Sequence, residues 1–355
     1  MKSSSNRVTL STVAQQVGVS TTTVSLILSN REEYVRQFHP ETVAKVRQSA
    51  KSLGYRTNIF ASGLPTRASP FFALVIRDIG RVDPQRWHSW VSEGDLLAGV
   101  IEAGSEKGLY PILAAIDPNA DDAGVDPTER LVSGGVFGTI VRTPSPPLEK
   151  FLLQQIKKGD RILTVCPDKL SRWPSNCIAV NNIQVGEHAA RLLAAAGRRK
   201  WGVVCYDQPR ARESHKLRIE GFTQAAEAVG ASVKTICVPS EQGRFSNGER
   251  ARFRESGLDG VFGVDSTLSI EAMFAGHEAG LRAGEDFLLV GVNCSHCSGR
   301  LHPRITSIDV SWREVGRKAV EALITLTDKN QQTCDRITVN PYVVAGDTCP
   351  APSEQ

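Results

Sequence analysis

Apolar positions near the N-terminus recur with the period of two short helices. The first four have the spacing i, i+3, i+4 and i+7, which predicts one apolar helix face: Leu10, Val13, Ala14 and Val17. Thr9 is a suitable N-cap for this helix, and Gly18 permits the tight turn that ends it. Ser20 is a second N-cap, so we expect another helix over residues 21–28.

The second predicted helix has an apolar and a polar side. Its apolar stripe consists of Val24, Ile27 and Leu28, and its polar residues are Thr21, Thr22 and Ser25. Two short helices joined by a glycine turn form a helix-turn-helix, which presents the start of its second helix to base edges. A third helix is expected over residues 40–53. An ordinary helical hairpin is the alternative, but it has no need of exposed hydroxyl groups at that position.

From residue 71 onward, short apolar runs alternate with helical stretches. This order predicts an α/β body with parallel sheets covered by helices on both faces, in two lobes of about five strands each. The predicted strands are 71–76, 110–115, 138–142, 161–165, 177–180, 201–206, 233–238, 259–264 and 286–292. The predicted helices are 93–107, 148–157, 185–196, 214–228, 266–279 and 310–326.

Charge separates the predicted helical head from the body. Residues 1–69 carry nine Lys or Arg and three acidic residues, whereas the rest of the chain carries 33 basic and 35 acidic residues. A basic head on a near-neutral body indicates a polyanion-binding module, although charge alone also fits a solvated tail. No apolar run reaches membrane-spanning length and no secretory signal is visible, so we expect a cytoplasmic protein, and a nucleoid-associated one because the head is expected to bind DNA. The eight cysteines are spread along the chain, mostly inside apolar runs, which predicts reduced thiols rather than a disulfide framework.

The head resembles the DNA-binding domain of the lactose/galactose repressor family. The resemblance is carried by residues 8–30, 39–46 and 53–64, and it implies that the second helix reads an operator. Leu26 stands where family members often have an arginine, so one expected contact to guanine is missing. The DNA-binding candidates are Thr9, Ser20, Thr21, Thr22, Ser25, Asn30, Arg47, Tyr55, Asn58, Ala61 and Leu64.

Residues 57–69 read as a short linker between the head and the body. Asn58 is a suitable N-cap, but Gly63 and Pro65 end a helix there after about one turn. In the resembled family this segment forms a hinge helix when it pairs with its dimer mate on DNA. The resemblance implies that Leu64 wedges into the minor groove, and packing of Leu64 on the next domain is the alternative.

The body resembles the periplasmic-binding-protein fold of the same family through residues 216–222, 289–293 and 303–308. Ligands of such sheets bind beyond the carboxyl ends of the strands, here in a cleft between two lobes. Arg218 matches a family position that clamps ligand hydroxyls or carboxylates, and a surface position is the alternative. Asn293 replaces the usual aspartate, a role that Asp265 is expected to take over. The other effector candidates are Arg142, Phe245 and Trp90, and core packing is the alternative for both aromatic residues.

No enzymatic or metal-binding motif stands out. Cys294 and Cys297 flank His296, but a structural zinc site needs four ligands and no second pair is evident, so we expect no metal or cofactor. We therefore expect a dimeric, non-enzymatic DNA-binding regulator of a pseudo-palindromic operator, controlled by a small molecule such as a carbohydrate. Its expected parts are the DNA-binding domain 1–56, the hinge 57–69, the effector body 70–347 and a tail 348–355. A solute-binding protein, an α/β enzyme and a corepressor-dependent regulator of a non-sugar metabolite are the alternatives.

Overall fold

The computed structural model describes residues 8–28, 32–55, 69–77, 87–116, 125–207, 212–238, 245–295, 301–326 and 333–351. The chain divides into two compact units. The first comprises the residues up to Phe71 together with 135–137, and the second comprises the remainder. The predicted hinge lies outside the described residues except for Ser69.

The N-terminal unit is a small helical headpiece. Its helices are α1 (Leu10–Val17), α2 (Thr21–Leu28), α3 (Glu32–Val35) and α4 (Pro40–Ser52). The three predicted helices are confirmed, and α3 is a short addition within the segment between α2 and α4. Side chains from α1, α2 and α4 form a common core, because the fully buried residues include Val13, Val24, Ile27 and Val46.

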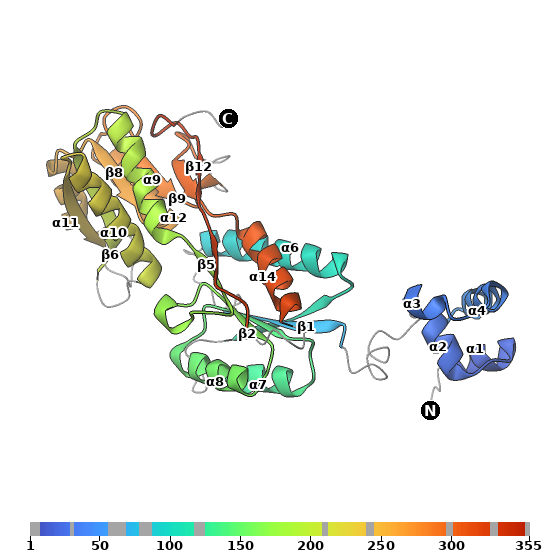
Figure 1. Ribbon diagram of the computed structural model, residues 1–355. Helices are drawn as coiled ribbons and strands as arrows, with labels where there is room; N and C mark the ends of the chain where they lie inside the picture. The colour runs from blue at the N-terminus through green and yellow to red at the C-terminus, as the bar shows by residue number, and fades with distance from the viewer. Residues whose placement is uncertain are drawn as a thin grey trace, which may run out of the picture. The chain divides into compact units, whose positions relative to one another are not determined.

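The first lobe of the body is a six-stranded sheet with the order β11-β5-β4-β3-β1-β2. Its strands are β1 (Phe71–Arg77), β2 (Tyr110–Ile116), β3 (Thr139–Arg142), β4 (Ile162–Val165), β5 (Cys177–Val180) and β11 (Ile337–Val339). Helices α6 (Trp87–Glu106) and α14 (Trp312–Thr325) cover one face, and α7 (Val125–Ser133) and α8 (Pro146–Lys157) cover the other (Figure 1). A short 3-10 helix spans Leu170–Arg172.

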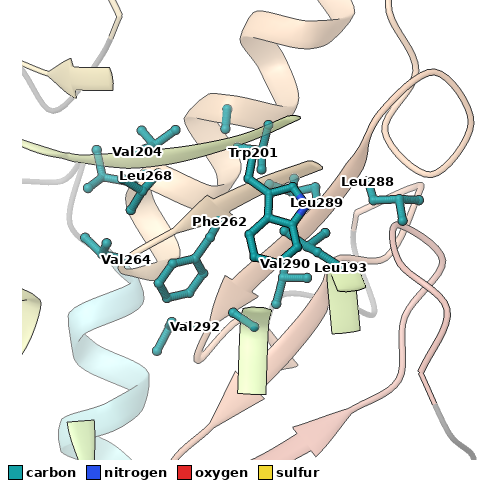
Figure 2. Packing of buried hydrophobic residues seen from close by; sticks show 14 of the residues in the cluster. Leu193, Trp201, Val204, Phe262, Val264, Leu268, Leu288, Leu289, Val290 and Val292 are labelled. Atoms are coloured by element: carbon teal, nitrogen blue, oxygen red, sulfur yellow. The ribbon is translucent and has the colours of Figure 1, made fainter. Parts of the chain in front are cut away.

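The second lobe is a six-stranded sheet with the order β12-β10-β9-β8-β6-β7. Its strands are β6 (Lys200–Tyr206), β7 (Ser232–Val238), β8 (Gly260–Gly263), β9 (Leu288–Val292), β10 (Thr306–Asp309) and β12 (Tyr342–Val344). Its helices are α9 (Asn182–Ala195), α10 (Glu213–Ala228), α11 (Asn247–Glu255) and α12 (Ser266–Glu278). The ladders are parallel except that β12 pairs antiparallel with β10. Figure 2 shows Trp201 and Phe262 among the aliphatic residues of this lobe's core.

The chain passes between the two lobes three times, from β5 to α9, from β10 to α14 and from β11 to β12. The nine predicted strands are confirmed, and each lobe has six strands rather than about five. Three strands were not predicted: β10, in which Ile308 is the one apolar residue, and β11 and β12, which have three residues each. Strands this short or this polar have no hydrophobic pattern that could reveal them. Thr348 and Cys349, assigned above to the tail, are buried in the second lobe, where the Thr348 hydroxyl donates to the Leu289 carbonyl.

Helices α9 and α10 approach each other closely through two glycines. A Cβ atom at Gly186 would lie 2.0 Å from the carbonyl oxygen of Arg218, and one at Gly221 would lie 2.1 Å from that of Ile183. Any side chain at these positions would therefore push the helices apart. This contact fixes α10, and with it Arg218, against the start of α9.

None of the described helices is long and apolar enough to cross a membrane.

Candidate functional sites

Local hydrogen bonds set the geometry of the helix-turn-helix. The Thr9 hydroxyl accepts from the backbone N–H of Thr12, which completes a capping box at the start of α1. Gly18 has a φ of 76° and donates its N–H to the Ala14 carbonyl at 2.9 Å, so the chain turns sharply after α1. The Ser20 hydroxyl accepts from the Thr23 N–H at 3.0 Å and begins α2. These residue types therefore produce the predicted turn.

The start of α2 presents hydroxyl groups to solvent. Thr21 and Thr22 are exposed, and Ser25 is half-buried. Arg47 is exposed on α4. Tyr55 packs partly against the headpiece core, and this burial raises the pKa of its phenol. The remaining DNA-binding candidates lie outside the described residues: Asn30, Asn58, Ala61 and Leu64.

A charged cluster lies at the carboxyl end of β3 in the first lobe. Arg142 ends the strand, and its Nε donates to Oε1 of Glu93 on α6 at 2.6 Å. The guanidinium carbon also lies 4.1 Å from the centroid of the Trp312 ring, at the start of α14. This arrangement combines an ion pair with a cation–π contact. Arg142 was predicted here, whereas Glu93 and Trp312 were not.

Cys166 follows β4 and belongs to the same cluster. It has a φ of 48°, a conformation that few residues other than glycine adopt. Burial raises the pKa of the Cys166 thiol, although the positive charges of Arg142 and Arg218 act in the opposite direction. Burial alone would lower the pKa of Arg142, but Glu93 and Cys166 outweigh it, so the pKa is raised and Arg142 stays charged.

Arg218 lies on α10 in the second lobe. Its Nε donates to Oδ1 of Asn182 at 2.9 Å, and its Nη1 donates to the Val264 carbonyl at 2.6 Å. Burial lowers the pKa of Arg218 to about 10, and the charge of Asp265 opposes that shift. The side chain is only 7% exposed, so the surface alternative is wrong. Because the charge of Arg218 also reaches Cys166, strand ends of both lobes contribute to one electrostatic environment.

Asp265 and His215 lie beside Arg218. Asp265 follows β8 and caps α12 by accepting from the Leu268 N–H at 2.9 Å. Its second carboxylate oxygen lies 3.7 Å from Nε2 of His215, whose ring stacks on Tyr206 with a centroid separation of 5.8 Å. Burial lowers the pKa of His215 to about 4, so the imidazole is neutral at physiological pH. His215 was not predicted, because its environment depends on Tyr206 at the end of β6 and on Asp265 after β8.

Asn293 has a structural role at the end of β9. It has a φ of 54°, and its side-chain oxygen accepts from the Val310 N–H at 2.9 Å. Val310 directly follows β10, where the chain begins to cross to the first lobe. The amide therefore joins the end of β9 to a segment between the lobes. This structural role of Asn293 was not predicted from the sequence.

Two predicted aromatic ligands have different outcomes. Phe245 is 3% exposed, and its ring lies 6.0 Å from that of Phe253 in the second-lobe core, which favours the core alternative, while its effector role stays a prediction. Trp90 lies within α6, which begins six residues earlier than predicted, and its side chain falls outside the described residues. Residues 87–92 therefore belong to the helix as well.

The Cys294 thiol is fully buried, with Sγ 3.5 Å from the Val292 carbonyl oxygen, whereas His296 and Cys297 lie outside the described residues. Within the described ranges, no group of His, Cys, Asp and Glu is arranged to hold a metal ion.

Comparison with known proteins relates both units to bacterial regulators. Residues 9–58 match bacterial regulatory proteins of the lacI family, and residues 190–349 match a periplasmic binding protein-like domain. The chain is 35% identical over 111 residues to the maltose regulon regulatory protein MalI of Vibrio furnissii, covering 31% of this chain and 72% of MalI. It is 24% identical over 346 residues to the transcriptional repressor PurR of Haemophilus influenzae (strain PittEE), covering 95% and 97% of the two chains.

A solved structure shares the fold over nearly the whole chain. The lac repressor dimer bound to operator and the anti-inducer ONPF superposes with a TM-score of 0.77 at 19% identity, covering 97% of this chain and 99% of the repressor chain. This likeness covers both the helical headpiece and the two-lobed body.

Proposed function

The chain belongs to the LacI family of bacterial regulatory proteins and is a transcriptional regulator, and we propose that it represses transcription by binding an operator as a homodimer. The observation that carries the DNA-binding role is the headpiece itself. Ser20 caps a short helix that exposes Thr21 and Thr22 at its start, as a major-groove reading helix requires. A two-fold dimer presents two such helices, which favours a pseudo-palindromic operator.

We assign the predicted parts of the chain accordingly. Residues 1–56 bind DNA, 57–69 form the hinge, and the body from residue 70 binds the effector and dimerises. The headpiece contacts to DNA are made by Thr9, Ser20, Thr21, Thr22, Ser25, Asn30, Arg47 and Tyr55. Asn58, Ala61 and Leu64 act in the hinge, with Leu64 as the minor-groove wedge. The protein acts in the cytoplasm at the nucleoid, and no catalytic role is proposed for it.

The effector site is proposed at the strand ends of the two lobes. Arg218 and Asp265 hold the ligand from the second lobe, and Arg142 holds it from the first. Support comes from the burial of both arginines and from the electrostatic coupling of Arg218 to Cys166. A carbohydrate fits these side chains, because guanidinium donors and carboxylate acceptors match hydroxyl groups. The name of MalI, which refers to the maltose regulon, agrees with this class.

Regulation requires a difference in effector affinity between two states of the protein. A ligand that bonds to both lobes favours one arrangement of them, and therefore alters DNA affinity only if that arrangement differs between DNA-competent and incompetent states. We propose that the effector relieves repression.

The decisive test is the selection of bound duplexes from random DNA by the purified full-length protein at near-physiological salt. We expect enrichment of a pseudo-palindrome with a flexible central step. Only salt-sensitive, non-specific binding, both alone and with a pool of sugars, would refute the sequence-reading role. Enrichment that appears only with a sugar would show corepression and reverse the proposed sign of regulation.

A further inference from the structure

Three buried polar atoms with no hydrogen-bond partner belong to side chains that meet at the carboxyl end of β3. They are Nη1 of Arg142, Oε2 of Glu93 and Nε1 of Trp312, none of which has a partner within the described part of the chain. The three side chains touch through the Arg142–Glu93 ion pair and the position of the guanidinium over the indole. Buried polar groups are nearly always hydrogen-bonded, so a concentration of unpaired ones at a strand end points to a ligand.

The positive charge of Arg142 is compensated by the negative charge of Glu93. Arg142 and Glu93 form an ion pair with a separation of 2.6 Å, and their side chains are 11% and 27% exposed. A partly buried ion pair leaves little net charge for a ligand to neutralise, because each charge already has an opposite neighbour. A buried arginine by itself suggests an anionic ligand, but a compensated arginine does not.

The two unpaired atoms of this pair differ in hydrogen-bonding type. Nη1 of Arg142 can only donate, and Oε2 of an ionised Glu93 can only accept. Ligand hydroxyl groups suit both atoms, since a hydroxyl accepts from the guanidinium and donates to the carboxylate. A ligand carboxylate or phosphate oxygen satisfies only the donor and meets the negative charge of Glu93.

We infer that Arg142 and Glu93 act together as a specificity-determining pair that selects an uncharged hydroxyl of the effector and rejects an anionic group at that position. The ion pair on Trp312, which leaves one donor of Arg142 and one acceptor of Glu93 without a partner, is the observation that carries this inference. It rests on the proposed function, because it concerns the effector site proposed above. An uncompensated arginine suits an anionic ligand. Glu93 compensates the charge of Arg142, so Arg142 binds a neutral hydroxyl group instead.

The test compares neutral sugars with their acids on the full-length protein. Glucose, galactose, maltose and cellobiose are titrated by calorimetry, each beside its uronic or bionic acid. We expect the wild-type protein to bind at least one neutral sugar about tenfold more tightly than its acid. Glu93→Gln adds a side-chain NH₂ donor and leaves the charge of Arg142 uncompensated. The ratio of the affinity for the neutral sugar to the affinity for its acid should therefore fall about tenfold or more.

Two further variants distinguish this role from a general effect of charge or folding. Glu102→Gln removes the same charge from the same helix, but Glu102 pairs with Arg313, so it should leave the ratio unchanged. Arg142→Gln leaves the charge of Glu93 uncompensated, so the ratio of the affinity for the neutral sugar to the affinity for its acid should rise above the wild-type value. Thermal melts verify that each variant is folded.

The outcomes separate this inference from the proposed function. A wild-type preference for the acids, or a ratio that Glu93→Gln and Arg142→Gln do not move in opposite directions, overturns the inference alone. Failure of every sugar and acid to bind overturns both the inference and the carbohydrate part of the proposed function. The DNA selection described above then decides independently whether the chain reads an operator.

Discussion

The buried His215 should make the stability of the second lobe depend on pH. Burial lowers the pKa of this imidazole from 6.5 to about 4, although the nearby Asp265 acts to raise it. Above pH 6.5 neither the folded nor the unfolded lobe protonates His215. Between pH 6.5 and 4 the unfolded chain takes up the proton and the folded lobe does not, so the free energy of unfolding falls. Below pH 4 both forms are protonated and the loss is complete.

The size of the effect follows from the two pKa values. Proton linkage gives a loss of roughly 2 kcal/mol between about pH 7.5 and pH 5, and about 3 kcal/mol well below pH 4. His215→Gln has no titrating group at this position. Over the same range, we expect its free energy of unfolding to fall by about 2 kcal/mol less than that of the wild-type protein. The difference in pH dependence is the predicted quantity, whatever the substitution does to absolute stability.

The assay must report on the second lobe alone, because a multidomain chain does not unfold in one step. Hydrogen exchange followed by mass spectrometry on peptides from β8 and β9 meets this need, after correction for the intrinsic exchange rate at each pH. His277→Gln is the matched control, since His277 is exposed on α12. Equal pH dependence of the wild-type protein and His215→Gln would refute the argument that burial keeps this imidazole neutral.

Four other predictions test packing and DNA recognition. Gly186→Ala should destabilise the second lobe by about 1–3 kcal/mol, measured by the same exchange method, because its Cβ would collide with α10. Glu149→Ala should lower the urea midpoint of the first lobe by the equivalent of about 1–3 kcal/mol, since it leaves the buried indole N–H of Trp173 unpaired. In the duplex selection, Thr22→Ala should change the preferred bases. Arg47→Ala should instead weaken binding to all sequences alike and flatten its salt dependence, as binding isotherms at several salt concentrations would show.

The parts of the fold that depend on local chemistry were predictable from the sequence. Thr9, Gly18 and Ser20 each satisfy backbone groups within four residues, so their roles follow from neighbouring positions. The longer strands were predictable because runs of buried apolar residues recur between helices. The three-residue strands β11 and β12 were not, since only the sheet they join holds them extended.

The composition of the candidate site was less predictable, because it depends on contacts between distant residues. Phe245 was assigned to the site as an isolated aromatic, but Phe253 gives it a place in the core. Glu93 lies 49 residues before Arg142 in the sequence, and nothing in its own neighbourhood indicates the ion pair. Strand ends could therefore be predicted as the location of the site, but not the side chains that compensate its charges.

The three passages of the chain between the lobes suggest how this site communicates with the rest of the body. One passage joins the end of β10 to α14, where Val310 is bound by the Asn293 side chain and Trp312 lies under Arg142. The same short segment thus contacts the strand end of β9 in the second lobe and the charged pair in the first. A ligand that bonds to Arg142 and Glu93 acts directly on side chains packed against this passage. In the proposed effector site, residues 310–312 therefore connect the charged pair of the first lobe to the strand end of β9 in the second.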